Sequence, residues 1–456
     1  MQVSGSLVKY PARVTFLWYL GLVVLGGLLL ARPFCCRSAE PVTALDAVFT
    51  STSACCVTGL AVRSTEHDFS LAGQIVILVL IQLGGIGIMT VTTFLMTHVG
   101  RADSLRDRAV IAMTLGADAK SDLRSILRGV LLMTVCFEGC GFVILAIRNL
   151  FDYPPAEALW QALFHSISAF CNAGFALHDD SLMRYRGDPV VNATICALVV
   201  IGGLGFPVIF DVLRQSRGPR RGFWDRLQMH SKIMLMGTAG LLAVSTGIFM
   251  FLESEGLLRE LPVWQWPMVA MFHSVSCRTA GFNTIDLTTM TNATLFFSML
   301  IMAIGAGPCS TAGGLKVSTV VVLLLQSLTS FRGYQRINIF RRTIPRSVVN
   351  RAIATTMLFV IIAGAALTIL MMFEQAEKPH IEAGHEFMDA SFEVASALGT
   401  VGLSTGITGD LTQAGRVIVI LLMFLGRLGP ISVFVALSLH ERTERIEMPA
   451  EEPLIG

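Results

Sequence analysis

Long apolar stretches alternate with short polar ones along the whole of this chain. A helix needs roughly 20 predominantly apolar residues to cross the hydrocarbon core of a bilayer. Eight stretches approach or exceed that length, and the pattern therefore predicts eight transmembrane helices, near residues 13–30, 71–97, 124–147, 189–213, 229–252, 293–327, 350–373 and 414–438.

Four shorter and less apolar stretches between successive pairs of spans form an internal repeat. Each contains a phenylalanine, then small or hydroxyl residues, then a glycine: AVFTSTSACCVTGL (47–60), ALFHSISAFCNAGF (162–175), AMFHSVSCRTAGF (270–282) and ASFEVASALGTVGL (390–403). About 10 helical residues reach only about 15 Å, so each stretch is predicted to enter the membrane as a half-helix and return. Such segments also occur where helices pack closely, but four copies in equivalent positions favour re-entrant loops.

The repeat divides the chain into four tandem units of helix, pore loop and helix. The predicted boundaries are residues 1–98, 99–214, 215–330 and 331–456, the last including a short cytoplasmic tail. The expected fold is therefore an all-α membrane protein with eight transmembrane helices and four re-entrant half-helices around one central pore.

Composition and charge support this interpretation and set the orientation. Hydrophobic residues make up 53% of the chain and charged residues 14%, where a soluble protein would have about a quarter charged. Arginine and lysine cluster in the loops after the second, fourth and sixth spans, and cytoplasmic loops carry such an excess. We therefore expect a multi-pass protein of the cell (inner) membrane with both termini cytoplasmic, and no nucleic-acid partner for these basic runs.

The returning part of each pore loop is predicted to form a cation site. Non-helical backbone at membrane depth is tolerated where it lines a water-filled path or is buried in protein. Carbonyl oxygens replace the hydration shell of an ion, and glycine permits the positive φ that orients them. The predicted potassium-filter residues, which are also the predicted metal ligands, are Val57, Thr58, Gly59, Asn172, Ala173, Gly174, Thr279, Ala280, Gly281, Thr400, Val401 and Gly402.

The sixth apolar stretch, 293–327, contains the sequence GAGPCSTAGG. A straight helix of that length would measure about 52 Å, against a hydrocarbon core of about 30 Å. We predict two half-helices joined by an intramembrane gate loop, a break expected in the third unit alone; the alternative is a proline kink for packing. The predicted gate residues are Gly305, Ala306, Gly307, Pro308, Cys309, Ser310, Thr311, Ala312, Gly313, Gly314, Lys316 and Arg427.

Several charged and titratable residues lie inside the apolar segments. Arg427 is predicted to bind carbonyl groups of the gate loop and hold it closed, the alternative being a side chain that snorkels to the cytoplasmic face. Arg278 is expected behind the filter, braced by Glu393 or Asp286. Lys316 has no role that the sequence assigns. His165 and His273 are expected to be hydrogen-bonded structural residues rather than metal ligands.

The motifs together resemble those of the Trk/Ktr/HKT superfamily of potassium transporters. The segments that carry the resemblance are TSACCVTGL, LIQLGGIGIMT (80–90), VIGGLGFPV (200–208), SCRTAGFNTID (276–286), STAGGLKVST (310–319) and FLGRLGP (424–430). Because the first span starts near residue 13, without the additional N-terminal helix pair of Trk-type subunits, the bacterial Ktr-type membrane subunit is the most similar. The paired Cys55 and Cys56 and the GAGPCS sequence depart from the commoner pattern.

The resemblance implies the following properties. Some plant relatives that prefer sodium carry serine at the first filter glycine, so Gly59 implies potassium as the transported ion. The resemblance also implies a homodimer in the lipid bilayer, resting on a cytosolic RCK/KTN (KtrA-type) regulatory ring. ATP or ADP is expected on that partner, and no cofactor in this chain.

Two other functional classes fit the sequence less well. A proton- or sodium-coupled secondary transporter of another small solute would have midplane acids and inverted repeats, whereas Glu138 alone is a mid-span acid and the repeats share one orientation. A membrane enzyme is not expected, because the sequence has no paired carboxylates and no HExxH motif.

Overall fold

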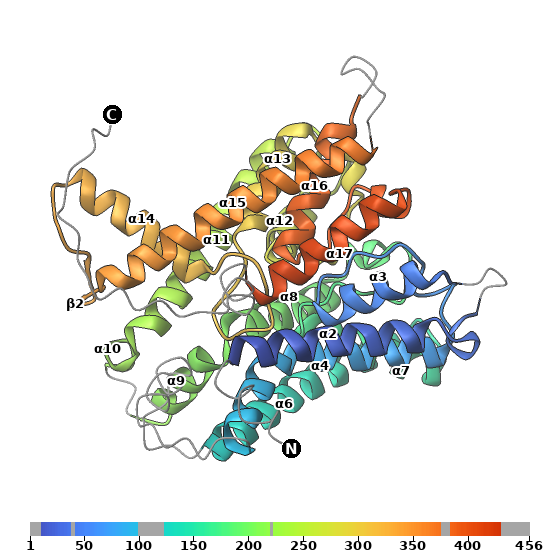
Figure 1. Cartoon of the computed structure of the whole chain (residues 1–456), viewed down its shortest axis with the longest axis horizontal. Coiled ribbons are helices and arrows are strands. Elements are labelled where there is room, and N and C mark those ends of the chain that lie inside the picture. The colour runs from blue at the N-terminus through green and yellow to red at the C-terminus, as the bar shows by residue number, and fades with distance from the viewer. Residues whose placement is uncertain (1–10, 38–41, 99–122, 219–221, 375–383, 430–456) are drawn as a thin grey trace.

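The computed structural model describes residues 11–37, 42–98, 123–218, 222–374 and 384–429, and these residues are mostly helical (Figure 1). The longer helices are α2 (Pro11–Leu30), α4 (Leu71–His98), α6 (Leu123–Asn149), α8 (Pro189–Leu204), α9 (Phe206–Ser216), α11 (Met229–Leu252), α13 (Asn292–Ala303), α14 (Val317–Phe331), α15 (Arg346–Glu374) and α17 (Gln413–Leu428). Each of the eight predicted spans coincides with one of these helices or with a pair of them; residues 430–438 of the last span lie outside the described residues.

Four shorter helices coincide with the repeated stretches: α3 (Ala44–Cys55), α7 (Pro155–Phe170), α12 (Trp266–Ser276) and α16 (Glu386–Gly399). The repeated phenylalanine of each motif is at most 3% exposed and packs in a hydrophobic core: Phe49, Phe164, Phe272 and Phe392. The remaining elements are α10 (Phe223–Arg226), a hairpin of β1 (Asn338–Ile339) and β2 (Arg342–Thr343), and 3₁₀ turns at Pro33–Cys35, Met183–Tyr185, Leu257–Glu260, Val263–Gln265, Leu287–Thr289 and Ile407–Gly409.

The outer helices present apolar side chains on the surface of the molecule. Within the described residues, three helical segments are long and apolar enough to cross a membrane, namely Arg128–Asn149, Met229–Leu252 and Arg346–Glu374. In their most apolar windows only 33%, 17% and 17% of the residues are buried. Exposed apolar surface on this scale suits contact with lipid. These helices mark a membrane protein, whereas the complete set of eight spans stays a prediction.

The fourth apolar stretch is not one straight helix. Helices α8 and α9 meet at Gly205, where the chain bends by 99°. Gly205 has φ of +92°, and Pro207 lies in the first turn of α9. A Cβ at Gly205 would lie 2.5 Å from Pro308 O, so the 305–314 segment packs directly against the bend. The prediction that only the third unit is broken is therefore wrong.

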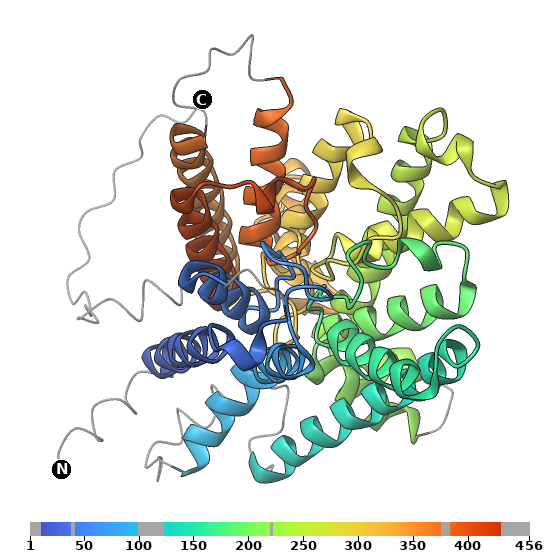
Figure 2. The same ribbon diagram turned by 90° about the vertical axis from the view of Figure 1, so that its right-hand side faces the viewer.

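Contacts between helices follow a cyclic order around the molecule. Helix α4 packs on α7, α8 on α12, α13 on α16, and α17 returns to α3. Helices α7, α12 and α16 therefore each pack against a longer helix that precedes them in the chain. Helix α3, the first short helix, packs against α17 near the end of the chain, which completes the circle. Figure 2 shows the non-helical segments gathered between the helices near the middle of the molecule.

Arginine residues gather at one end of the molecule, where α9, α10, α14 and the hairpin lie (Figure 1). Six of them, which we call the arginine face, are all exposed: Arg332, Arg336, Arg341, Arg342, Arg346 and Arg351. The basic loop after the second span, with Arg101, Arg106, Arg108 and Lys120, lies outside the described residues, as do Arg220, Arg221, Glu377, Glu382 and the C-terminal tail.

Candidate functional site

The four segments that follow the short helices share one backbone conformation. Each has a positive φ at a non-glycine residue and again at the glycine two residues later: Val57 and Gly59, Asn172 and Gly174, Thr279 and Gly281, Thr400 and Gly402. The φ values of these glycines are +97°, +71°, +76° and +94°. In such alternating conformations successive N–H groups point to one side, so the carbonyl groups point to the other. All twelve predicted filter residues lie on these segments.

The four glycines form a closed ring. A Cβ built on each would meet the carbonyl oxygen of the residue that precedes the glycine of another segment: Ala173 for Gly59, Ala280 for Gly174, Val401 for Gly281 and Thr58 for Gly402. The first three separations would be 2.5, 2.9 and 2.6 Å, shorter than real Cβ contacts. Glycine is therefore required at these positions both by the positive φ and by the space that neighbouring segments occupy.

Serine side chains of the short helices fix this backbone. Ser53 Oγ accepts a hydrogen bond from Gly59 N at 3.0 Å, and Ser396 Oγ accepts one from Gly402 N at 3.0 Å. Ser168 and Ser276 instead donate to the carbonyl oxygens of Phe175 and Phe282. The sequence prediction did not include these serines, although the aligned repeats show a serine five or six residues before every ring glycine.

The predicted gate segment lies between α13 and α14 and is held against the end of α8. Gly307 N donates to Gly203 O at 2.8 Å, and Thr311 N to Gly202 O at 3.4 Å. Gly305 N donates to Leu315 O at 2.7 Å, which joins the two ends of the segment. A Cβ at Gly305 would overlap Gly313 O. The segment is thus a compact loop inside the helical assembly and not a simple proline kink.

The same loop contacts the ring from one side. A Cβ at Gly313 would lie 3.0 Å from Thr400 Cγ2, and one at Gly314 would lie 3.1 Å from Gly399 O. Thr311 Oγ1 donates to Phe170 O at 3.2 Å. The loop therefore touches the residues at which the second and fourth segments enter the ring.

Arg427 of α17 is buried against three other elements, with 4% of its surface exposed. Its guanidinium donates to Thr311 O of the loop and, at 2.5 Å, to Gly84 O of α4, while Nε donates to the Tyr19 hydroxyl of α2 at 3.3 Å. The Thr311 contact matches the predicted kind of partner, a loop carbonyl, whereas Gly84 O and the Tyr19 hydroxyl were not predicted. The buried side chain does not snorkel to the cytoplasmic face.

Lys316, to which the sequence assigns no role, also binds the loop. Its Nζ donates to Ala312 O at 2.8 Å and to Gly313 O at 3.2 Å. Together with the Arg427 contact to Thr311, three consecutive loop carbonyls accept hydrogen bonds from cationic side chains.

The prediction for Arg278 is wrong in its partner. Its side chain is buried, and Nη2 lies 3.4 Å from Thr238 Oγ1 rather than beside an acid. Glu393 instead accepts from Ser404 and Thr408, and Asp286 accepts from Thr288 N and Oγ1. Both acids stabilise their own loops, which leaves them unavailable to Arg278.

His165 and His273 have the hydrogen bonds expected of structural residues. Leu177 N donates to His165 Nε2 at 3.3 Å, which fixes the chain just after the second ring segment. His273 Nε2 lies 2.9 Å from Ser298 Oγ and joins α12 to α13.

A family profile named TrkH, described as a cation transport protein, matches residues 27–447 of the chain. The Ktr system potassium uptake protein B of Vibrio alginolyticus is 39% identical over 97% of this chain and 94% of the relative. The protein of the same name from Bacillus subtilis is 37% identical over 98% and 97%. The potassium/sodium uptake protein NtpJ of Enterococcus hirae is 34% identical, also over 98% and 97%.

A solved structure with the same fold is that of the potassium transporter TrkH from Vibrio parahaemolyticus. It superposes with a TM-score of 0.72 at 19% sequence identity, over 93% of this chain and 84% of that one. The family match covers most of the chain, and the relatives are matched almost end to end. The chain therefore belongs to the TrkH family of cation transport proteins.

Proposed function

We propose that this protein is the ion-translocating membrane subunit of a potassium uptake system of Ktr type. The observation that carries the proposal is the closed ring of four glycine segments with alternating φ. The full-length relatives named as potassium uptake proteins support the choice of ion. The proposed topology has eight spans, four re-entrant half-helices, both termini in the cytoplasm and an inner-membrane location.

In the proposed filter, potassium loses its water and binds carbonyl oxygens from the four segments. Such a site needs oxygens held at a fixed distance from the axis. The Ser53 and Ser396 hydrogen bonds to the ring glycines would provide that rigidity. The reaction breaks no covalent bond, so the function needs no catalytic residue and no enzyme activity.

The proposed gate is the 305–314 loop. A fixed cation in a permeation path raises an electrostatic barrier to other cations. Arg427 and Lys316 would supply that barrier, and their bonds occupy carbonyl oxygens that could otherwise bind a passing ion. Opening would require the loop to break its hydrogen bonds with Arg427, with Lys316 and with the carbonyl groups of α8.

The test of the proposed function is uptake of ⁸⁶Rb⁺ by liposomes that contain the purified protein. Liposomes loaded with potassium should accumulate ⁸⁶Rb⁺, and barium should block this uptake. External potassium should compete with ⁸⁶Rb⁺ more strongly than external sodium does. A proton- or sodium-coupled carrier of another solute would show no such uptake. Absence of flux in correctly folded protein would contradict the proposed function.

The proposed partner is a cytosolic RCK/KTN (KtrA-type) ring that binds ATP or ADP and contacts a homodimer of this chain. Relatives named as parts of a Ktr system support a separate regulatory subunit. The arginine face would attract an acidic rim on such a partner. A nucleotide could then bias the gate by binding two partner conformations unequally.

Reversing charge on the arginine face is expected to weaken that association. The double change Arg341→Glu and Arg342→Glu should lower the fraction of the regulatory subunit that co-purifies, most clearly at low ionic strength, because the charges are exposed. The matched control is Arg259→Glu, an exposed arginine at the opposite end of α11. Equal co-purification by both variants would contradict the proposed contact surface.

A further inference from the structure

Two loops that leave the ring of glycine segments carry paired acid and histidine residues. Glu66 and His67 follow Gly59 in the first loop, and His178 and Asp179 follow Gly174 in the second. The chain enters the ring on the side that touches the 305–314 loop, so residues after the glycines leave on the other side. The two pairs therefore come together beyond the ring, away from that loop.

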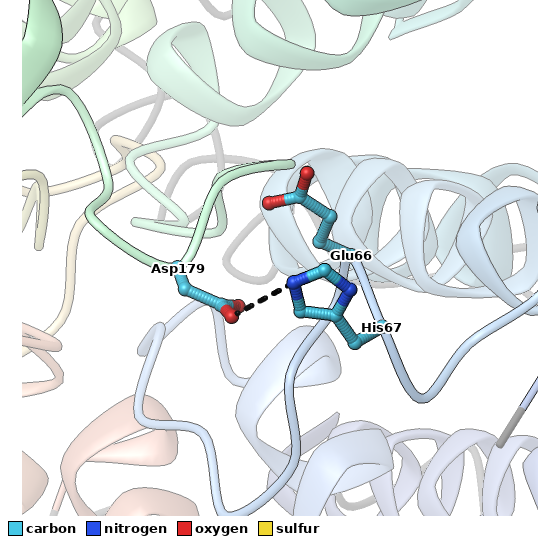
Figure 3. A group of neighbouring side chains, drawn as sticks. All are labelled: Glu66, His67 and Asp179. Carbon is cyan, nitrogen blue, oxygen red and sulfur yellow. Dashed lines mark ion pairs between the residues drawn. The ribbon is translucent and has the colours of Figure 1, made fainter.

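Three of these side chains converge on one point (Figure 3). A ligand atom from each of Glu66, His67 and Asp179 lies within 4.8 Å of the others. His67 Nε2 and Asp179 Oδ2 are 3.4 Å apart. Donors about 2.0–2.1 Å from a tetrahedral zinc ion are separated by about 3.3–3.4 Å. Small side-chain rotations would bring the third donor to that spacing.

His178 is an independent sign of a ligand. The residue is 7% exposed, yet neither ring nitrogen has a hydrogen-bond partner among the residues that the structure describes. Its Nδ1 lies 3.8 Å from Glu66 Oε2, and its ring stacks on Tyr153 with centroids 6.2 Å apart. A buried polar group without a partner is costly, and a metal bound at Nδ1 would remove that cost for one of the two ring nitrogens.

The surrounding residues hold the carboxylates in place and leave coordinating oxygens available. Ser64 Oγ donates to Asp179 Oδ1 at 2.5 Å, which leaves Oδ2 toward His67. The same Ser64 Oγ accepts from His67 N at 3.0 Å. Among the described residues, the ion-pair partners of Glu66 and Asp179 are histidines, while the neighbouring Arg184 is paired with Asp180. Arg37 reaches only the backbone oxygen of Glu66.

We propose that Glu66, His67, His178 and Asp179 form a binding site for a divalent transition-metal ion of the zinc type, which links the loops that follow the first and second ring segments. Two imidazoles with two carboxylates suit zinc, whereas calcium and magnesium prefer oxygen ligands alone.

The bound ion would act on transport in two ways. Its double positive charge would neutralise the Glu66 and Asp179 carboxylates, which otherwise attract potassium to this end of the ring. It would also tie together two adjacent loops whose segments share the ring contact between Gly59 and Ala173. Slower potassium entry in the presence of zinc is the expected result. This effect rests on the proposed function, whereas metal binding itself does not.

Binding is tested by calorimetry with zinc chloride on the full-length, tag-free protein in lipid nanodiscs. The variants are His67→Ala, which changes an exposed side chain, and His178→Phe, which keeps a ring against Tyr153. Each is expected to raise the Kd for zinc by about 10-fold or more, since even outer-shell partners contribute that much. His385→Ala removes an exposed histidine elsewhere and should leave the Kd unchanged.

Saturable zinc binding that both variants weaken and that excess calcium does not displace would support the site. No saturable binding, an unchanged Kd in His67→Ala and His178→Phe, or displacement by calcium would overturn it.

The effect on transport is tested by measuring ⁸⁶Rb⁺ uptake with and without external zinc. Inhibition that the two variants lose would support the effect on transport, and equal inhibition of all variants would overturn that effect. Protein that binds zinc but takes up no ⁸⁶Rb⁺ would leave the site standing and contradict the proposed function.

Discussion

Replacing Gly59 with serine is expected to lower the preference for potassium over sodium by about 10-fold, equivalent to about 1.4 kcal/mol between the two ions. The new Cβ would lie 2.5 Å from Ala173 O and 3.0 Å from Gly174 Cα, at a residue with φ of +97°. The neighbouring segment must shift, and a displaced carbonyl no longer replaces the hydration shell of potassium in the same geometry. The measurement is uptake of ⁸⁶Rb⁺ and ²²Na⁺ by the same liposomes.

Gly406→Ser is the matched control, because it separates backbone strain from crowding in the ring. Gly406 has φ of +102°, close to that of Gly59, but a Cβ there would have no atom within 4 Å. Both changes impose the strain of a positive φ on a residue with a Cβ, about 1–2 kcal/mol. We expect this strain to lower the thermal stability of both variants by similar amounts. We expect the preference between potassium and sodium to change only in Gly59→Ser. Unchanged preference in a folded Gly59→Ser protein would contradict the filter assignment.

The repeated pattern made much of the architecture predictable. Four copies of one motif predicted four short helices, each followed by a glycine with positive φ, and helices α3, α7, α12 and α16 lie there. The signal is strong because a glycine with positive φ and a buried phenylalanine are needed at the same place in every copy. Hydropathy predicted the longer helices for a similar reason, since lipid contact demands long apolar faces.

Contacts between distant parts of the chain were harder to predict. The bend at Gly205 depends on the backbone of Pro308 and Cys309, more than 100 residues away, and VIGGLGFPV reads equally well as one helix. Arg278 was expected to pair with an acid, but Glu393 is already bound by Ser404 and Thr408. Spacing along the chain does not show which hydrogen bonds an acid has already made.

The Lys316 contacts were missed for a different reason. A lysine at the start of a helix usually reads as a solvated charge, whereas here the preceding loop folds back so that its carbonyls face the ammonium group. By contrast, Arg427 was predictable because a charge inside an apolar span must find polar partners. The loop carbonyl of Thr311 is one of those partners.

Arg427→Ala is expected to increase the velocity of potassium uptake and to weaken its dependence on the proposed regulatory subunit. The guanidinium joins Thr311 O of the loop to Gly84 O of α4 and to the Tyr19 hydroxyl of α2. A hydrogen bond from a charged group contributes about 1.5–3 kcal/mol. Loss of the loop contact should therefore raise the ratio of open to closed loop by about 10- to 100-fold. The flux should rise until another step limits it.

Two further variants separate a latch from general damage. Lys316→Met removes the other cation that binds the loop, and should also increase flux because Ala312 O and Gly313 O lose their donor. Arg416→Ala changes an arginine of the same helix α17 that pairs with Asp46 of α3 at 2.6 Å and does not contact the loop. It should lower thermal stability without increasing flux.

The measurement is the initial rate of ⁸⁶Rb⁺ uptake at equal amounts of folded protein, with and without the proposed regulatory subunit and ATP. An increase confined to Arg427→Ala and Lys316→Met fits a loop that two cations hold closed, because removing either one lowers both the barrier and the attachment. A folded Arg427→Ala protein that is slower than the parent would show that the arginine supports the conducting state. The 305–314 loop would then be part of the permeation path and not its gate.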